Sequence, residues 1–377
     1  MNCSQSDAAR QQRLVHSRAE QTDVSGFFDV LTGPRLLQEV EELLPAHRER
    51  VFPPTETLAL FMAQALSADG SCQQVVNDAI VQRIVAGRPR NSSRTAAYCK
   101  ARMRLQETMI STLACRVGGM LGEDAVDWWR WRGRRIRLVD GTTMTLADTE
   151  ANQAEYPQPA SQRQGLGFPI LRAVALLCLS SGAVLDTATG PCKGKGGDEQ
   201  TLLRALLDHL APDDVLLGDA FFPTYFLLCE LQRRGVDGLF EQHGARKRST
   251  DFRRGKRLGP RDHLIVWDKP KKPDWMAQAE YDQVPQTLTV REFRAANKIM
   301  VTTFLCPKQT SKAVLKALYK QRWNVELDLR NIKTTLGMER LRCKTPAMAL
   351  KELWVYLLAY NLIRLLMAQA ALLADQI

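Results

Sequence analysis

The chain has 377 residues, which is enough for two or three domains with a substantial hydrophobic core. Lysine and arginine number 52 against 41 aspartate and glutamate residues, so the net charge of +11 suits a polyanionic partner. The nine cysteines show neither a Cys-x-x-Cys pair nor a His/Cys metal spacing, which argues against a zinc site and fits a reducing cytoplasm. The polar N-terminus lacks the apolar core of a signal peptide, so we expect a cytoplasmic protein.

The N-terminal third of the chain is predicted to be helical after a polar start. Residues 1–54 are polar and then weakly helical, and residues 55–125 form short helices separated at Gly70-Ser71 and at 87–93. The last of these helices carries four basic residues: Arg94, Lys100, Arg102 and Arg104. Short helices with a basic final helix are typical of a small DNA-binding unit, but also of an ordinary helical layer with a soluble face.

Two apolar runs within residues 126–240 each lead into an aspartate. The alternating run 135–139 precedes Asp140, and the run 215–218 precedes Asp219. Both runs predict strands that end in an aspartate beside a tight turn, where functional side chains of open α/β sheets gather. For either aspartate alone, a turn or helix cap is the simpler explanation, and the helical motif further along the chain reverses that balance.

Two further strands and a helix are expected between these aspartates. The strands cover residues 170–179 and 183–187, and a helix over residues 199–210 is capped by Asp198. The glycine-rich stretch 193–197 lacks the Gly-Lys-Ser/Thr ending of a nucleotide-binding loop, so we interpret it as a flexible loop.

Residues 241–310 are predicted to be a basic, β-rich insertion. Strand-like runs occur at residues 263–267, 287–291 and 299–304. Eight cations fall within 16 residues: Arg246, Lys247, Arg248, Arg253, Arg254, Lys256, Arg257 and Arg261. A basic cluster is often only a solvated surface, but this density indicates contact with a DNA backbone.

Residues 311–377 begin with the most informative pattern in the chain. Tyr319, Arg322, Glu326 and Lys333 are predicted to lie on one helix, where residues seven apart nearly eclipse at ~100° per residue. Apolar residues on the opposite face indicate that this helix is docked. A carboxylate can hold a divalent cation and the cations can hold phosphate, although an ordinary ion-paired surface is the simpler reading of the stretch alone.

Three carboxylates therefore have the placement needed for metal-dependent chemistry. Asp140 and Asp219 on strands, with Glu326 on a docked helix, can together hold two divalent metals ~3.5–4 Å apart. Such a pair activates an oxygen nucleophile and stabilises the leaving oxygen in phosphoryl transfer.

The run 353–373 is unusually apolar but is not predicted to cross a membrane. Asn361 and Arg364 interrupt it, so we expect a helix buried against the sheet.

These motifs together resemble those of DDE transposases of the insertion-sequence-four type. The resemblance is carried by Asp140 in Val-Asp-Gly-Thr-Thr, by Asp219 in Gly-Asp-Ala-Phe-Phe and by the Tyr-Arg-Glu-Lys pattern from Tyr319 to Lys333. It extends from about residue 55 to the C-terminus, and the Tyr-Arg-Glu-Lys pattern is its most specific part.

The resemblance implies an α+β fold, an RNase H-like mixed sheet flanked by helices, with a β-rich insertion and an N-terminal helical DNA-binding domain. Residues 126–240 and 311–377 would form the catalytic core. It further implies Mg²⁺, or Mn²⁺ in its place, held by Asp140, Asp219 and Glu326. Tyr319, Arg322 and Lys333 would bind DNA phosphates. The partners would be the terminal inverted repeats of a bacterial insertion sequence and target DNA, bound by a homodimer at the nucleoid.

The chain departs from this family in one respect. Some relatives carry a tryptophan just before the last strand of the insertion, where this chain has only non-aromatic residues at 296–300. Trp267, Trp275 and Trp323 are nearby in sequence, and base stacking by any of them is open. Two alternative functions also remain at this point: an RNase H-fold nuclease without joining activity, and a non-catalytic DNA-binding repressor of transposition.

Overall fold

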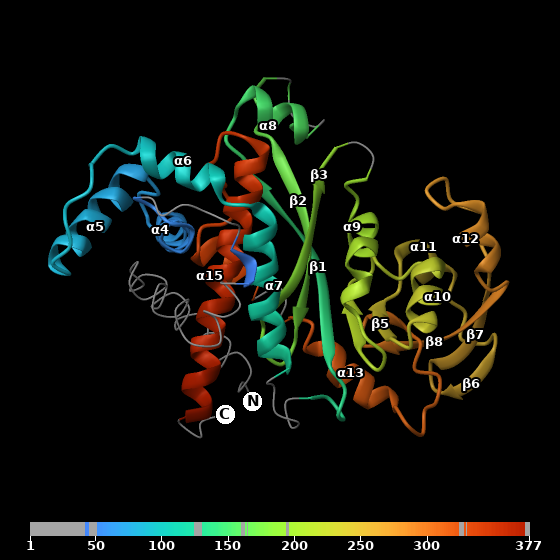
Figure 1. Cartoon of the computed structure of the whole chain (residues 1–377). Helices are drawn as coiled ribbons and strands as arrows, with labels where there is room; N and C mark the ends of the chain where they lie inside the picture. The colour runs from blue at the N-terminus through green and yellow to red at the C-terminus, as the bar shows by residue number, and fades with distance from the viewer. Residues whose placement is uncertain are drawn as a thin grey trace.

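The computed structural model describes residues 42–44, 51–123, 130–159, 163, 165–193, 196–323, 328 and 330–373. In this part of the chain the strands form one mixed sheet with helices on both faces (Figure 1). The strand order is β3-β2-β1-β4-β5-β9-β8-β7-β6. A mixed sheet flanked by helices is the architecture expected from the sequence.

The strands are β1 (Ile136–Thr145), β2 (Ile170–Cys178), β3 (Val184–Pro191), β4 (Val215–Gly218), β5 (Asp237–Glu241), β6 (Lys256–Gly259), β7 (Asp262–Asp268), β8 (Thr287–Ala295) and β9 (Lys298–Thr302). The helices are α4 (Pro54–Leu66), α5 (Cys72–Val85), α6 (Ala96–Arg104), α7 (Glu107–Glu123), α8 (Glu150–Glu155), α9 (Glu199–Leu206), α10 (Tyr225–Arg233), α11 (Gly244–Ser249), α12 (Gln278–Gln283), α13 (Lys312–Lys320) and α15 (Pro346–Leu373). A 3₁₀ turn, η2 (Leu207–His209), and a π-helical turn, η3 (Asn331–Thr335), complete the described elements. Each predicted strand is present, and β5 and β6 were not predicted.

The first half of the sheet has the strand order expected of an RNase H-like core. β1 pairs antiparallel with β2, β2 pairs antiparallel with β3, and β4 and β5 follow in parallel. Alternate residues of β1 face two different cores, because side chains alternate along a strand. Leu138 packs into the core beneath α7 and α15, and Val139 packs into the core beneath α9 and α10.

The end of β1 differs from the prediction. The strand does not stop before Asp140 but continues to Thr145, which lies opposite Ile170 of β2. β-Branched threonines suit this extended pairing, which persists after the neighbouring strand β4 has ended. Asp140 therefore lies inside a strand, whereas Asp219 directly follows β4 as predicted.

The strands of the insertion extend the same sheet. β9 pairs antiparallel with β5, so β6 to β9 continue the sheet beyond its first half. A buried bidentate ion pair strengthens this region, with Arg291 donating to Asp262 at 2.8 and 2.6 Å. Arg291 also donates to the Thr310 carbonyl at 2.7 Å, which ties the insertion to the chain just before α13.

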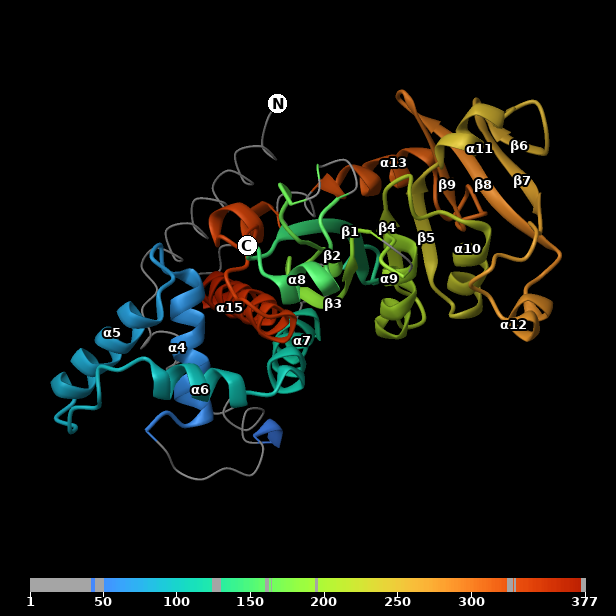
Figure 2. The same cartoon turned by 90° about the horizontal axis from the view of Figure 1, so that it is seen from above.

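Helices α4, α5 and α6 form a small unit on the side of α15 that faces away from the sheet (Figure 2). The unit has its own apolar core, which includes Val76 and the buried ring of Tyr98. The predicted break at Gly70-Ser71 is present, and the Ser71 hydroxyl caps α5 by accepting from the Gln74 amide. The unit joins the rest of the fold through α4, which packs against α15.

The polar residues of the apolar segment 353–373 explain why it is a buried helix. The fully buried amide of Asn361 accepts from Val184 N at 2.9 Å and donates to the carbonyls of Val184 and Ala114 at 2.8 and 2.9 Å. Arg364 donates to the Ser181 carbonyl. α15 thereby supplies hydrogen-bond partners to β3, the strand at the edge of the sheet. Across the described residues, no helix combines the length and apolar character needed to cross a membrane.

Replacing Asn361 by leucine is expected to destabilise the fold by about 2–4 kcal/mol. The substitution leaves the amide and carbonyl of Val184 and the carbonyl of Ala114 without this partner in a buried position, at about 1–3 kcal/mol for an unsatisfied group. Urea unfolding followed by circular dichroism measures the change. Leu366→Ala on the exposed side of the same helix is the control and should cost less than about 1 kcal/mol. Equal effects of the two substitutions would contradict this account of α15.

Candidate functional site

Asp140 and Asp219 occupy matching positions on two neighbouring parallel strands. Leu138 of β1 lies opposite Leu217 of β4, and each aspartate follows two residues later in its own chain segment. Because paired strands lie ~4.8 Å apart, this register brings the two aspartates side by side. They are separated by 79 residues along the chain (219 − 140). The register thus places both aspartates at corresponding positions of neighbouring segments, and the convergence of all three carboxylates stays a prediction.

Local hydrogen bonds orient both carboxylates. Oδ1 of Asp140 accepts from the Gly141 amide at 2.9 Å, and Oδ1 of Asp219 accepts from the Phe221 amide at 2.8 Å. The turn after Asp219 is held from the other side by α9, because Gln200 Nε2 donates to the Phe221 carbonyl at 2.9 Å. Asp219 thus lies at the end of β4 in a turn that two hydrogen bonds hold in place.

The C-terminal end of α13 delivers two residues of the Tyr-Arg-Glu-Lys pattern to the same place. Tyr319 Oη donates to the Gly218 carbonyl at 3.2 Å, immediately before Asp219. Arg322 Nη1 lies 3.7 Å from Asp140 Oδ2, and both side chains are largely buried. Burial raises the pKa of Tyr319 to about 12, against the opposing effect of Arg322, so the phenol remains a neutral hydrogen-bond donor.

The prediction of one continuous helix through this pattern is wrong. α13 ends at Lys320, and Gln321 and Arg322 form a turn before the helical residue Trp323. Lys333 lies in the π-helical turn η3, which directly follows the helical residue Arg330. Tyr319 and Lys333 therefore do not share one α-helical face. Glu326 lies outside the described residues. Among the described residues, no ion pair joins Lys333 to Asp140 or Asp219.

Glu199 is a site neighbour that the sequence reasoning missed. Its carboxyl group packs on the backbone of Gly141, where an added Cβ would come within 2.4 Å of the glutamate Cδ. Burial raises the pKa of Glu199, Arg172 opposes this increase, and Asp219 and Asp198 add to it. The only signals in the sequence were the glycine after Asp140 and a glutamate at the start of a helix, and neither is specific.

The donor chemistry of the two aspartates fits a hard divalent cation. Carboxylate oxygens are the ligands that Mg²⁺ and Mn²⁺ prefer, and adjacent carboxylates repel each other unless a positive charge lies near. Arg322 brings one such charge to Asp140. Within the described part of the chain, no group of three His, Cys, Asp or Glu side chains is arranged to hold a metal ion. A third carboxylate would come from Glu326.

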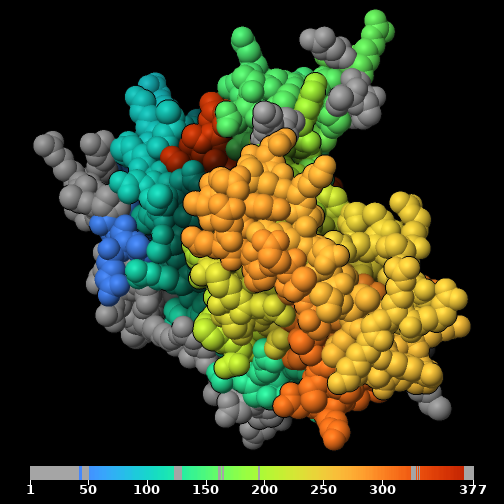
Figure 3. Space-filling view, turned by 90° about the vertical axis from the view of Figure 1, so that its right-hand side faces the viewer, coloured from blue at the N-terminus to red at the C-terminus, as the bar shows by residue number. Residues whose placement is uncertain are grey.

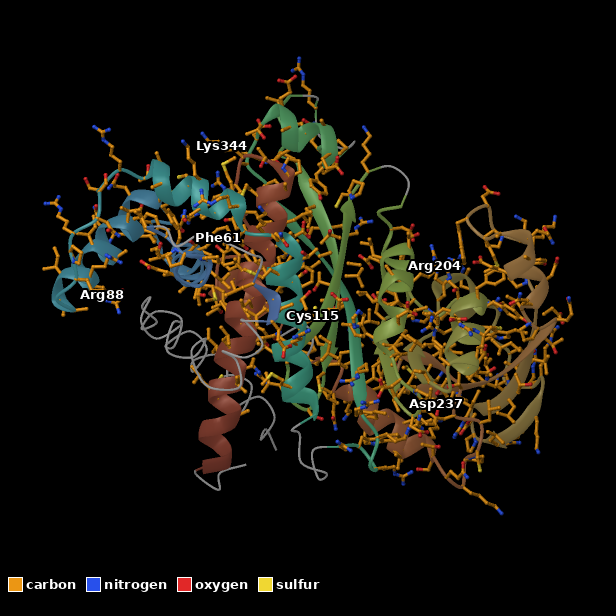
Figure 4. The ribbon with its side chains drawn as sticks, in the orientation of Figure 1. Phe61, Arg88, Cys115, Arg204, Asp237 and Lys344 are labelled. Carbon is orange, nitrogen blue, oxygen red and sulfur yellow. The ribbon has the colours of Figure 1, made fainter. Side chains whose placement is uncertain are left out.

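The basic residues of α6 and its preceding turn do not all face solvent. Arg94, Lys100 and Arg104 are exposed, as a DNA-binding surface requires. Arg102 instead points into the helical unit, where it donates to Gln64 Oε1 at 2.9 Å and stacks on the ring of Phe61. Phe61 lies on α4, inside the helical unit (Figure 4). We therefore correct the expectation for Arg102, whose guanidinium stabilises the unit.

Most of the basic run of the insertion is exposed: six of its eight cations are exposed, and Arg246 and Lys247 are partly buried. The insertion covers much of the face seen in Figure 3. Arg253 and Arg254 are 91% and 80% exposed, and Lys256 and Arg257 are also exposed on the adjoining strand. Arg253 also donates to both oxygens of Asp251, at 2.9 and 3.0 Å. These four cations are thus exposed, and Arg253 and the more distant Arg254 share the ion-pair partner Asp251.

The three nearby tryptophans differ in their availability. Trp267 is buried and donates to Glu292 Oε1 at 3.2 Å, so it is not placed to stack on a base. Trp275 is half exposed, but Arg204 of α9 lies 3.8 Å from its ring centroid. Trp323 is 62% exposed and directly follows Arg322.

Comparison with known proteins identifies the family of the chain. Residues 131–362 match the family described as a transposase DDE domain, and this range includes both aspartates and the Tyr-Arg-Glu-Lys pattern. The chain is 25% identical over 334 residues to the transposase InsG for insertion sequence element IS4 of Escherichia coli (strain K12), covering 86% of this chain and 72% of the relative.

A solved structure supports the same fold. The piggyBac transposase, in a synaptic complex with hairpin DNA, matches with a TM-score of 0.50 at 10% identity, over 95% of this chain and 77% of the other. The family match covers more than half of the chain and contains the paired aspartates. The chain therefore belongs to the family of transposases with a DDE domain, of the insertion-sequence-four type that its motifs indicated, and it is the transposase of an insertion sequence.

Proposed function

We propose that Asp140, Asp219 and Glu326 form a metal-dependent site that hydrolyses a phosphodiester at a transposon end and then joins the released 3′-hydroxyl to target DNA. The observation that carries the proposal is the register of β1 and β4, which sets two carboxylates side by side and next to Arg322 and Tyr319. Polar residues that meet from segments far apart in the chain are characteristic of a functional site, because an ordinary surface ion pair does not require several distant segments to meet.

The carboxylates would hold two Mg²⁺ ions, or Mn²⁺ in their place. When bound there, the cations supply activation of an oxygen nucleophile and stabilisation of the leaving oxygen. Arg322 lies close enough to Asp140 to bind a phosphate oxygen at the same place. Tyr319 is anchored to the backbone before Asp219 and shapes the site, and Lys333 would hold a phosphate of the flanking DNA.

The DNA would be double-stranded and would contact the protein mainly through its backbone. Arg253, Arg254, Lys256 and Arg257 form a displayed basic surface on the same sheet as the aspartates. Exposed cations of the N-terminal unit, Arg94, Lys100 and Arg104, would bind a second stretch of the terminal repeat. The homodimer expected on DNA follows from the family resemblance, and light scattering of the protein–DNA complex measures it.

Asp140→Asn should abolish metal-dependent cleavage while leaving DNA binding intact. The substitution preserves volume but removes a negative ligand, and loss of preorganised charge at such a site costs ~10²–10³ in rate or more. Mn²⁺ affinity, followed by electron paramagnetic resonance, should fall in parallel. Asp148→Asn is the matched control, because Asp148 is an exposed aspartate beyond the end of the same strand. Unchanged Mn²⁺ affinity and cleavage in Asp140→Asn would overturn the proposed site.

Neutralising Arg253, Arg254, Lys256 and Arg257 together should weaken DNA binding and flatten its salt dependence. Each lost phosphate contact should reduce the slope of log affinity against log salt by roughly 0.9. Fluorescence anisotropy with a labelled duplex at several salt concentrations measures the slope. Asp251→Asn is the control of opposite sign, because it removes the acidic partner of Arg253 and should strengthen binding. An unchanged slope would show that the basic surface is only solvated.

Glu326→Gln should stop cleavage and joining but retain binding of end DNA, because the phosphate-binding cations remain. Lys333→Ala should impair both binding and chemistry, since its proposed partner is a phosphate. Strand cleavage and joining with Mg²⁺, assayed beside end binding, separates the two residues. A wild-type protein that binds ends but never cuts them would be a repressor, and one that cuts but never joins would be a nuclease.

A further inference from the structure

The insertion contains a buried histidine held between two oxygen atoms. His263 of β7 lies directly opposite Glu292 of β8, and the two residues are 1% and 4% exposed. His263 Nε2 lies 3.2 Å from Glu292 Oε2, and Nδ1 lies 2.7 Å from the carbonyl oxygen of Arg254. Both ring nitrogens therefore face an atom that accepts hydrogen bonds.

A count of hydrogens shows that this arrangement requires an additional proton. A neutral imidazole has one N–H, which His263 must direct at the Arg254 carbonyl because a carbonyl has no proton to give. The other oxygen of Glu292 already accepts from Gln242 Nε2 at 2.8 Å and Trp267 Nε1 at 3.2 Å. One further proton must then lie between His263 Nε2 and Glu292 Oε2, or two lone pairs would face each other.

The surrounding charges are compatible with an imidazolium–carboxylate pair. Burying Glu292 as a bare carboxylate is costly, so a positively charged partner compensates it. Arg246 of α11 stacks over Trp267 at 3.9 Å from the ring centroid, and its positive charge also stabilises the Glu292 carboxylate. Asp262 and Arg291 are next to His263 and Glu292 in their strands, so their side chains point to the opposite face of the sheet. Arg257 lies opposite His263 on β6 and is exposed.

His263 also fixes the turn that displays the basic surface. The Arg254 carbonyl is bound to its ring, and the ring of Phe252 packs on it with centroids 4.9 Å apart. Gly255 has a φ of 72°, and a Cβ there would lie 2.0 Å from the Leu264 carbonyl oxygen, so only glycine allows the turn to approach β7 so closely. The turn is therefore held from beneath, with its arginine side chains in solvent.

We propose that the protonated His263–Glu292 pair is a positioning element that preorganises the turn 251–255 for binding to DNA phosphates. Arg253 and Arg254 would then meet the backbone without first being ordered, which reduces the entropic cost of binding. The additional proton lets both ring nitrogens donate, and its loss would leave one of them facing an acceptor without a hydrogen and would weaken the hold on the turn. The proposal rests on the DNA contact proposed above for the basic surface.

The protonation state is tested on the full chain with ¹⁵N-labelled histidine, of which there are five residues. At about pH 6, within the range where histidines titrate, both ring nitrogens of His263 should give the similar shifts of an imidazolium. In Glu292→Gln, the amide can donate to Nε2, so His263 should become the neutral Nδ1–H tautomer with the turn still held. A neutral His263 ring in the wild-type protein at this pH would overturn the proposal.

The effect on DNA is tested by the affinity for a generic labelled duplex between about pH 6 and about pH 8. Wild-type affinity should decrease across this range, and Glu292→Gln should remove the part of the decrease that belongs to the pair. His263→Gln places an amide near the Nε2 position but releases the Arg254 carbonyl, so affinity at about pH 6 should fall about three- to tenfold, the size expected for one hydrogen bond. His263→Asn, with an amide near the Nδ1 position, should restore most of it.

His243→Asn is the matched control, because His243 is an exposed histidine of the same insertion that caps α11. It should leave the pH dependence unchanged. An unaltered pH profile in both Glu292→Gln and His263→Gln would sink the positioning role. If neutralising the four cations of the basic surface leaves the salt slope unchanged, the proposed DNA contact itself fails, and the ¹⁵N spectra still decide the protonation of the pair.

Discussion

The parallel pairing of β1 with β4 is the constraint on which the site depends. Side chains two residues beyond a paired position in each of two neighbouring parallel segments lie on the same side, so Asp140 and Asp219 are brought together by register alone. Adjacent carboxylates repel each other, and the fold places Arg322 near them through α13, which ends at this point. The hydrogen bond from Tyr319 to the Gly218 carbonyl fixes that helix end to the strand that it serves.

The two faces of the sheet have different tasks. On one face, α15 and α7 form the larger apolar core, and buried polar groups such as Asn361 give the edge strand β3 the partners that it lacks in the sheet. On the other face, α9 begins beside the aspartates, with Glu199 on the backbone after Asp140 and Gln200 on the turn after Asp219. Stability and site geometry are therefore carried by separate layers around the same strands.

The insertion belongs to the same sheet as the site, because β9 pairs with β5, which in turn pairs with β4. Its buried polar groups are paired with each other, as Arg291 with Asp262 and His263 with Glu292, so the strands beneath the exposed cations are anchored. The DNA contact proposed for this basic surface would therefore lie in a fixed relation to the aspartates, which a flexible loop would not ensure. The exposed arginines and the buried network are thus parts of one structure.

Local sequence patterns were sufficient to predict the elements that are determined by neighbouring residues in the chain. The apolar runs predicted the strands before Asp140 and Asp219, and the Asp198 cap predicted the start of α9. The break at Gly70-Ser71 predicted the boundary before α5, and the polar residues in the segment 353–373 predicted a buried helix. The density of cations likewise indicated that most of the basic run is exposed, because unpaired charged side chains remain in solvent.

Tertiary structure decided whatever depends on a distant partner. β1 continues past Asp140 because β2 continues to pair with it, and Arg102 turns inward because Gln64 and Phe61 accept its guanidinium. α13 ends before the Tyr-Arg-Glu-Lys pattern is complete, although the helical periodicity of the apolar residues continues through it. Glu199 reaches Gly141 only because α9 packs on the sheet over β2 and β3 and begins next to Gly141. His263 needs a proton only because Glu292 and the Arg254 carbonyl face its two ring nitrogens. Sequence alone therefore determined which residue types were available, and the pairing of strands and packing of helices determined which of them meet.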